Sequence, residues 1–170
     1  MGGSGPCDMT QETLVLGGGP IGLELAAELA AQDRPVSFVD GERMAERARR
    51  AGLIAHESTL ETAPSVERSA STVVVATPSD ARNLLLAAAA PRAFDAERVI
   101  ALVNDPDRQA AFEDIGVETV CVSRTLARVT TDSIGVAELS AADRAAETDG
   151  RAAEADGPVA DIDGRVRRSG

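Results

Sequence analysis

The chain contains no lysine, no tryptophan and no tyrosine, and its only aromatic residues are three phenylalanines. All 17 basic residues are therefore arginines, and 28 acidic residues bring the net charge to −11. An acidic chain with few aromatic rings repels nucleic acid and gives bases little to stack on, which excludes a nucleic-acid partner. The acid excess favours a halophilic, archaeal source, because concentrated salt shortens the Debye length to about 3 Å at 1 M and weakens self-repulsion. A GC-rich genome, which favours Arg and Ala codons, is the alternative explanation.

Cysteines and long apolar runs are also scarce. Two cysteines are too few for a disulfide framework, and the apolar run around Cys121 predicts a buried, inert thiol. Residues 1–11 lack the basic start and the apolar core of a signal peptide. The longest apolar run, residues 84–90, is far too short to span a bilayer. We therefore expect a cytoplasmic protein with no direct membrane insertion.

Short apolar strand patterns alternate with helix patterns through most of the chain. Strands are expected at 13–16, 36–39, 53–55, 72–76, 98–103 and 119–122, and helices at 20–32, 42–51, 59–69, 79–90, 105–115 and 124–131. Pro91 is expected to end the fourth of these helices, and Asp105 to cap the fifth. The alternation predicts an α/β fold, a doubly wound Rossmann-like six-stranded parallel sheet of order 3-2-1-4-5-6. This domain would cover residues 12–135, between a disordered leader at 1–11 and an acidic, mostly disordered tail at 136–170.

A glycine-rich turn, Gly17-x-Gly19-x-x-Gly22, follows the first expected strand. In this motif the first glycine permits a tight turn, the second lets the backbone approach a pyrophosphate, and the third lets the helix pack close to the strand. Pro20 presets the first helical turn, which also contains Ile21, and the N–H groups of that turn face the phosphates. A strand, a glycine turn, a helix, a second strand and an acid in this order predict a nucleotide-binding site.

Polar residues at the ends of the other strands complete the candidate site. Asp40 ends the second strand, where a carboxylate accepts both ribose hydroxyls and repels a 2′-phosphate, so NAD or another adenosine nucleotide is favoured over NADP. Its alternative role is to cap the following helix. Arg43 either reaches the adenine or a phosphate or is a solvated helix charge, and Glu57 is a further candidate contact. Thr77 and Asn104 follow the fourth and fifth strands, beside the topological switch point.

The sequence has few of the residues that a metal site or an active site would need. The single histidine, His56, has no second histidine or cysteine at metal-ligand spacing, so no metal site is predicted. Without tyrosine or lysine, the chain has no Tyr–Lys proton relay or lysine base for hydride-transfer chemistry. We expect a protein that is not an enzyme. An NAD-dependent oxidoreductase and a degenerate Rossmann scaffold without ligand are the alternatives.

Four stretches resemble the TrkA-N domain, the nucleotide-binding half of the RCK (regulator of potassium conductance) or KTN family. They are Leu16–Gly22, Val39–Arg43, Val75–Leu84 and Ala101–Val117. The third resembles the family's Thr-x-x-Asp-x-x-Asn-Leu element, and the fourth its Val-Asn-Asp-Pro and Phe-x-x-x-Gly-Val elements. In place of the family's Gly-Asp-Ala-Thr after the third strand the chain has residues 56–59, His-Glu-Ser-Thr, and we expect the polar segment 136–170 to replace the family's C-terminal sensing subdomain.

The resemblance implies a function and a set of site residues. A domain of this family binds NAD, NADH or an adenine nucleotide (AMP, ADP or ATP), forms a homodimer or higher oligomer, and reports nucleotide state to a potassium channel or transporter. The residues that would line the site are Gly17, Gly19, Gly22, Asp40, Arg43, Thr77 and Asn104. The resemblance thus implies a regulatory protein of potassium or other cation transport.

Overall fold

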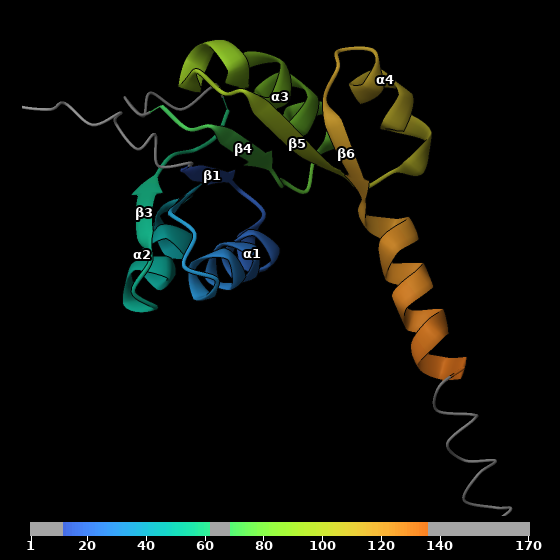
Figure 1. Cartoon of the computed structure of the whole chain (residues 1–170), viewed down its shortest axis with the longest axis horizontal. Coiled ribbons are helices and arrows are strands. Elements are labelled where there is room, and N and C mark those ends of the chain that lie inside the picture. The colour runs from blue at the N-terminus through green and yellow to red at the C-terminus, as the bar shows by residue number, and fades with distance from the viewer. Residues whose placement is uncertain (1–11, 62–68, 136–170) are drawn as a thin grey trace, which may run out of the picture. The chain divides into compact units, whose positions relative to one another are not determined.

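A computed structural model describes residues 12–61 and 69–135. Its described residues form a six-stranded parallel sheet of order β3-β2-β1-β4-β5-β6, so the predicted fold class and strand order are confirmed (Figure 1). The strands are β1 (Thr13–Leu16), β2 (Val36–Asp40), β3 (Ile54–Glu57), β4 (Thr72–Val75), β5 (Arg98–Val103) and β6 (Glu118–Cys121). The helices are α1 (Gly19–Ala31), α2 (Glu42–Arg50), α3 (Asp80–Phe94), the 3₁₀ helix η1 (Pro106–Arg108), α4 (Gln109–Glu113) and a last helix at 122–135.

The chain divides into two compact units, Met1–Leu126 and Ala127–Gly170. The first unit contains the whole sheet, and the helix at 122–135 crosses the division. The predicted leader at 1–11 and tail at 136–170 lie outside the described residues. Across the described ranges, no helix combines the length and the apolar character needed to cross a membrane.

The sheet separates two apolar clusters, as expected for parallel strands that are apolar on both faces. On one face, α3 and α4 pack on the strands, and the largest buried side chains there are Phe94, Phe112, Leu14, Leu16 and Val103. On the other face, α1 and α2 lie over β1, β2 and β3, with Phe38, Val15, Leu23, Ala26 and Ala45 at the centre (Figure 1). This layering brings the carboxyl ends of β1, β2 and β4 side by side, which is where the glycine turn lies.

One helix end differs clearly from the prediction. Pro91 does not end its helix; α3 continues through it to Phe94. Proline costs about 3 kcal/mol inside a helix because it removes one N–H and crowds the preceding turn. Phe94 is only 1% exposed and packs in the apolar cluster beneath α3. Burial of that ring, together with Ala90, offsets the local cost.

Other boundaries differ by smaller amounts. Val122 belongs to the last helix rather than to β6, and that helix runs to 135 rather than 131. The helix predicted at 105–115 is split into η1 and α4, although Asp105 does cap it by accepting a hydrogen bond from the Asp107 N–H at 3.0 Å. The described part of the helix predicted at 59–69 is not helical, and its middle, 62–68, lies outside the described residues.

Candidate functional site

The glycine turn joins β1 to α1 through three consecutive glycines in the left-handed region. Gly17, Gly18 and Gly19 have φ values of 72°, 95° and 53°. The Gly17 N–H donates to the Val39 carbonyl at 2.7 Å, which ties the turn to β2. A Cβ atom on Gly22 would lie 1.9 Å from the Gly17 carbonyl oxygen, so only glycine lets α1 approach the strand this closely. The packing role predicted for Gly22 is confirmed.

Asp40 lies at the carboxyl end of β2, directly beside this turn. Its carboxylate accepts the Gly19 N–H at 2.9 Å through Oδ2 and the Gly41 N–H at 2.7 Å through Oδ1. These two hydrogen bonds hold the carboxylate next to the start of α1. Asp40 therefore does more than cap the following helix α2. Each carboxylate oxygen has two acceptor positions, so one on each oxygen is left for a second donor. Two hydroxyls of a ribose are donors of the required kind.

Thr77 closes the other side of the turn. A Cβ atom on Gly17 would lie 2.7 Å from Thr77 Cγ2, so the threonine methyl group fills the space that a glycine leaves. Thr77 is buried, and its hydroxyl donates to Asn83 Oδ1 at 2.5 Å. The Asn83 amide donates to the carbonyls of Thr77 (2.9 Å) and Leu102 (2.8 Å), which links the ends of β4 and β5. Thr77 thus supports the turn by packing, and its contact with a ligand stays a prediction.

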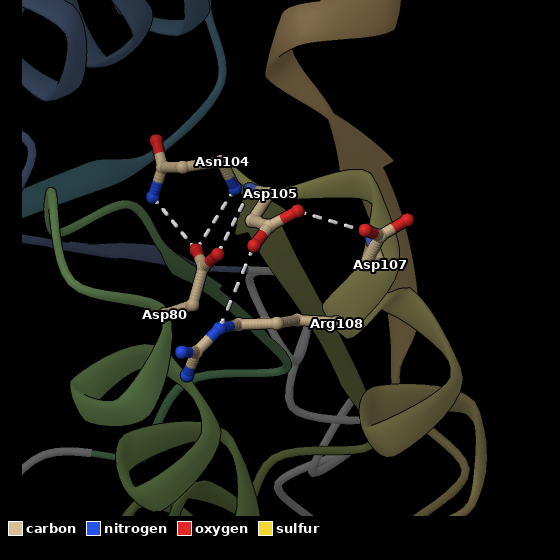
Figure 2. Close-up of polar contacts among 5 residues, drawn as sticks. All are labelled: Asp80, Asn104, Asp105, Asp107 and Arg108. Atoms are coloured by element: carbon tan, nitrogen blue, oxygen red, sulfur yellow. Dashed lines mark hydrogen bonds and ion pairs between the residues drawn. The ribbon is translucent and has the colours of Figure 1, made fainter.

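Asn104 and Asp80 form a second link across the same edge of the sheet. Figure 2 shows the Asp80 carboxylate facing the first two residues after β5. It accepts the Asn104 N–H and side-chain amide, each at 2.8 Å, and the Asp105 N–H at 2.9 Å. Asn104 Oδ1 points away from Asp80 and is not used in this cluster (Figure 2). The first residue after β5 is therefore held in place with an unused acceptor at its tip.

The charge of Asp80 is set by two opposing effects. Burial disfavours the charged form and would raise its pKa, since the side chain is only 9% exposed. The hydrogen bonds from the Asn104 and Asp105 N–H groups and from the Asn104 amide act the other way, helped by the positive charge of Arg108. They prevail, so the pKa of Asp80 lies below its ordinary value. Asp80 is ionised at neutral pH and acts as an anchor for the loop after β5.

The remaining predicted residues are placed at the edges of this arrangement. Glu57 pairs with Asp40 in the β2–β3 register, so two acids end neighbouring strands. Arg43 is exposed in the first turn of α2, where it makes no hydrogen bond or ion pair with another described residue. Pro20 and Ile21 are exposed in the first turn of α1. His56 has a buried Nε2 without a hydrogen-bond partner, and the described residues contain no group of three or more acids, histidines or cysteines able to hold a metal.

The structure adds Gly18 to the candidate site and gives partners to Asp80 and Asn83, the acid and the amide of the Thr-x-x-Asp-x-x-Asn-Leu element. Gly18 occupies a variable position of the glycine motif, yet a Cβ atom there would lie 2.8 Å from the Gly22 nitrogen. A role as caps of α3 was the alternative for this segment, and Ser79 does cap α3 by accepting the Arg82 N–H at 3.4 Å. The partners of Asn83 and Asp80 lie on β5 and directly after it, about twenty residues along the chain, so only the fold reveals these hydrogen bonds.

Cys121 is the last residue of β6 and directly precedes the last helix. It is a free thiol and buried, as predicted. Its Sγ lies 3.4 Å from the Ser123 hydroxyl. That hydrogen bond and the Arg124 N–H lower the pKa of the thiol. No described acid or base of the glycine turn contacts it, so it is not part of the candidate site.

Known proteins that resemble this chain contain nucleotide-binding or TrkA-N domains. Residues 13–123 match the model of the TrkA-N domain. The structure resembles the NAD(P)-binding domain of an exopolyphosphatase-related protein from Archaeoglobus fulgidus, with a TM-score of 0.63 and 24% identity over 74% of this chain and 98% of that one. It also resembles the TrkA-N domain of inner membrane protein ybaL from Escherichia coli, with a TM-score of 0.61 and 20% identity over 74% and 97%. No curated protein matches the chain. The family match covers well over half of the sequence, and the chain belongs to the TrkA-N domain family.

Proposed function

We propose that this domain binds NAD or NADH, or else an adenine nucleotide, and serves as a non-catalytic regulator of potassium or other cation transport. The observation that carries the proposal is the placement of Asp40 at 2.9 Å from the Gly19 N–H, at the start of α1. A carboxylate and a helix N-terminus side by side provide one group for a ribose and another for a phosphate. The family match and the NAD(P)-binding name of the A. fulgidus neighbour support this assignment.

Each part of the nucleotide meets a matching group. The Gly18 N–H and the positive end of the α1 dipole would hold the pyrophosphate. The N–H groups of Gly17, Gly19, Ile21 and Gly22 already donate to Val39, Asp40 and Gly18. The unused acceptor positions of Asp40 would take the ribose hydroxyls. Asn104 Oδ1, which faces away from its Asp80 anchor, is available to a donor on the distal half of the ligand (Figure 2). Arg43 is exposed in the first turn of α2, close in sequence to Asp40, and would contact the adenine or a phosphate.

The charge at this edge favours NAD over NADP. Asp40 and Glu57 end neighbouring strands, so a 2′-phosphate on the adenosine ribose would meet two carboxylates. Repulsion between a 2′-phosphate and these carboxylates would weaken binding. No arginine among the described residues forms an ion pair with either acid. We therefore expect NADPH to bind at least about tenfold more weakly than NADH.

A regulatory role fits the residues better than an oxidoreductase does. The chain has no lysine or tyrosine, and its only histidine lies on β3 with Nε2 turned into the protein. Hydride transfer needs a positioned acid or base near the nicotinamide, and none is provided by the described residues around the turn. The E. coli neighbour is part of an inner membrane protein, which supports a membrane channel or transporter as the partner that the domain would regulate from the cytoplasm.

Calorimetry on the full chain in concentrated KCl tests the proposal. NAD, NADH, NADPH, AMP, ADP and ATP are titrated separately, and Asp40→Ala should weaken the tightest of them about tenfold or more. Asp114→Ala, which removes an exposed acid at the end of α4, is the matched control and should leave affinity unchanged. Absence of heat with every nucleotide would favour the ligand-free scaffold. Turnover of bound NADH with a redox substrate would favour the oxidoreductase.

A further inference from the structure

The side chain of Asn104 has an orientation that its neighbours fix. Its amide nitrogen donates to Asp80 Oδ1 at 2.8 Å and to the Thr77 carbonyl at 3.4 Å, while Asn104 Oδ1 points away from Asp80 (Figure 2). Asp80 is buried and its pKa lies below the ordinary value, so its carboxylate is ionised and can only accept hydrogen bonds. A flipped amide would set its oxygen against two acceptors. Both amide hydrogens are therefore used inside the protein, and the free group at the tip is an acceptor.

Asn104 lies on the β4 and β5 side of the glycine turn. Thr77, whose carbonyl accepts its amide, also packs against the turn, since a Cβ atom on Gly17 would lie 2.7 Å from the Thr77 methyl group. Asn104 is exposed, so a ligand can reach it. Asp40 and Asn104 follow β2 and β5, which are three strand spacings or about 14 Å apart across β1 and β4. A dinucleotide laid across the switch point with its adenosine ribose at Asp40 therefore has its second nucleoside beside Asn104.

The surroundings of Asn104 contain more acids than bases. Of the residues drawn in Figure 2, Asp80, Asp105 and Asp107 are acids and Arg108 is the base. Asp105 and Asp107 are exposed, and the Arg108 guanidinium lies 3.8 Å from the Asp105 carboxylate. Three carboxylates and one guanidinium give this group a net negative charge. A phosphate chain that extends past the glycine turn would meet like charge there, whereas an uncharged hydrogen-bond donor would not.

We propose that Asn104 Oδ1 accepts the carboxamide N–H of a nicotinamide, and that Asp80 is the positioning residue that keeps this acceptor turned to the ligand. The contact rests on the nucleotide binding proposed above and decides between the ligands left open there. The carboxamide is an uncharged donor at the distal end of NAD and NADH. AMP and ADP end at the glycine turn, and ATP would add a charged acceptor beyond it. The residues after β4 and β5 thus select NAD or NADH over the adenine nucleotides.

Dinucleotides that differ only at the carboxamide test this contact, by calorimetry on the full chain in concentrated KCl. NAD should bind about five- to tenfold more tightly than its 3-acetylpyridine analogue, in which a methyl group replaces the amide nitrogen and no donor remains. Thionicotinamide adenine dinucleotide keeps the N–H donor and is the matched control, with an affinity close to that of NAD. ADP-ribose, AMP, ADP and ATP should each bind about fivefold or more weakly than NAD, because none offers a donor at this position.

The ligand series separates failure of this contact from failure of nucleotide binding. Equal affinities for NAD, the acetylpyridine analogue and ADP-ribose would overturn the carboxamide contact and leave the nucleotide-binding function in place. ATP as the tightest ligand would do the same, because the acidic surroundings of Asn104 would then not act against phosphate. Absence of heat with every ligand would overturn the nucleotide-binding function as well.

Variants of the chain separate positioning from folding. Asp80→Asn offers Asn104 both a donor and an acceptor, so the preference for NAD over the acetylpyridine analogue should fall to about twofold or less while the affinity for ADP-ribose is unchanged. Asn104→Leu removes the acceptor and should abolish the preference. Asp107→Asn, the matched control, removes a nearby exposed acid and keeps the Asp80–Asn104 hydrogen bond, so it should retain the preference. Equal loss of affinity for NAD and ADP-ribose in Asp80→Asn would overturn the positioning role, and an unchanged preference in Asn104→Leu would overturn the contact.

Discussion

Asp80 shows how much a single buried carboxylate contributes to the geometry of the candidate site. It accepts three hydrogen bonds from Asn104 and Asp105, two of them from backbone N–H groups. Asp80→Ala leaves those donors without a partner and should lower the free energy of unfolding by about 2–3 kcal/mol. Asp80→Asn keeps one acceptor and should cost about half as much. Urea unfolding of both variants measures the difference, and an unchanged midpoint for Asp80→Ala would show that water replaces the carboxylate at no cost.

The lowered pKa of Asp80 adds a prediction about pH. A carboxyl group whose folded pKa lies below its ordinary value of 3.8 contributes stability above that value and loses it as the pH falls through the folded pKa. The stability difference between the wild type and Asp80→Asn should therefore be constant from about pH 7 to 5 and shrink toward pH 3. Unfolding curves collected across that range measure it. A difference that grows on acidification would contradict the assigned direction.

Two glycines at the same edge of the sheet give a matched pair of tests. A Cβ atom on Gly22 would lie 1.9 Å from the Gly17 carbonyl, whereas one on Gly41 would meet nothing within 4 Å. Gly22→Ala should therefore force α1 away from the strand and cost about 3 kcal/mol, with loss of nucleotide binding. Gly41→Ala, at a φ of −59°, should change stability by less than about 0.5 kcal/mol. Thermal unfolding compares them directly, and similar losses in both would mean that the turn relaxes around the added methyl group.

At the level of elements, α3 tests whether the cost of a proline inside a helix is offset by packing against the sheet. Pro91 lies in the helix interior and leaves the Ala87 carbonyl, one turn back, without a backbone donor. Pro91→Ala restores that hydrogen bond and should stabilise the protein by about 1–2 kcal/mol, because the gain in the helix exceeds the entropy that the unfolded chain recovers. Chemical unfolding measures the change. A loss of stability would show that the pyrrolidine ring itself packs favourably.

The same helix illustrates what could be predicted from the sequence. The path from β1 through the glycine turn and α1 to Asp40 was predictable because strand pattern, turn residues and helix pattern all agree there. The end of α3 was not, because the burial of Phe94 that overrides Pro91 depends on the sheet beneath it. His56 and Glu57 belong to β3 through pairing with β2 rather than through their own strand propensity. The hydrogen-bond partners of Asn83 and Asp80 could not be predicted, since the β4–β5 arrangement sets them.

At the scale of the whole molecule, the charge of −11 without any lysine makes stability depend on salt. Repulsion among exposed acids opposes the compact state, and at 1 M salt the Debye length of about 3 Å screens most of it. We expect the unfolding free energy to rise by about 1–2 kcal/mol between 0.1 and 2 M KCl, which raises the midpoint by several degrees in a chain of this size. Scanning calorimetry in KCl measures it, with sucrose of equal osmolality as the control for excluded cosolutes. Equal rises in KCl and sucrose would assign the effect to solvent exclusion, and a midpoint that does not rise in KCl would show that the acid excess is not an adaptation to salt.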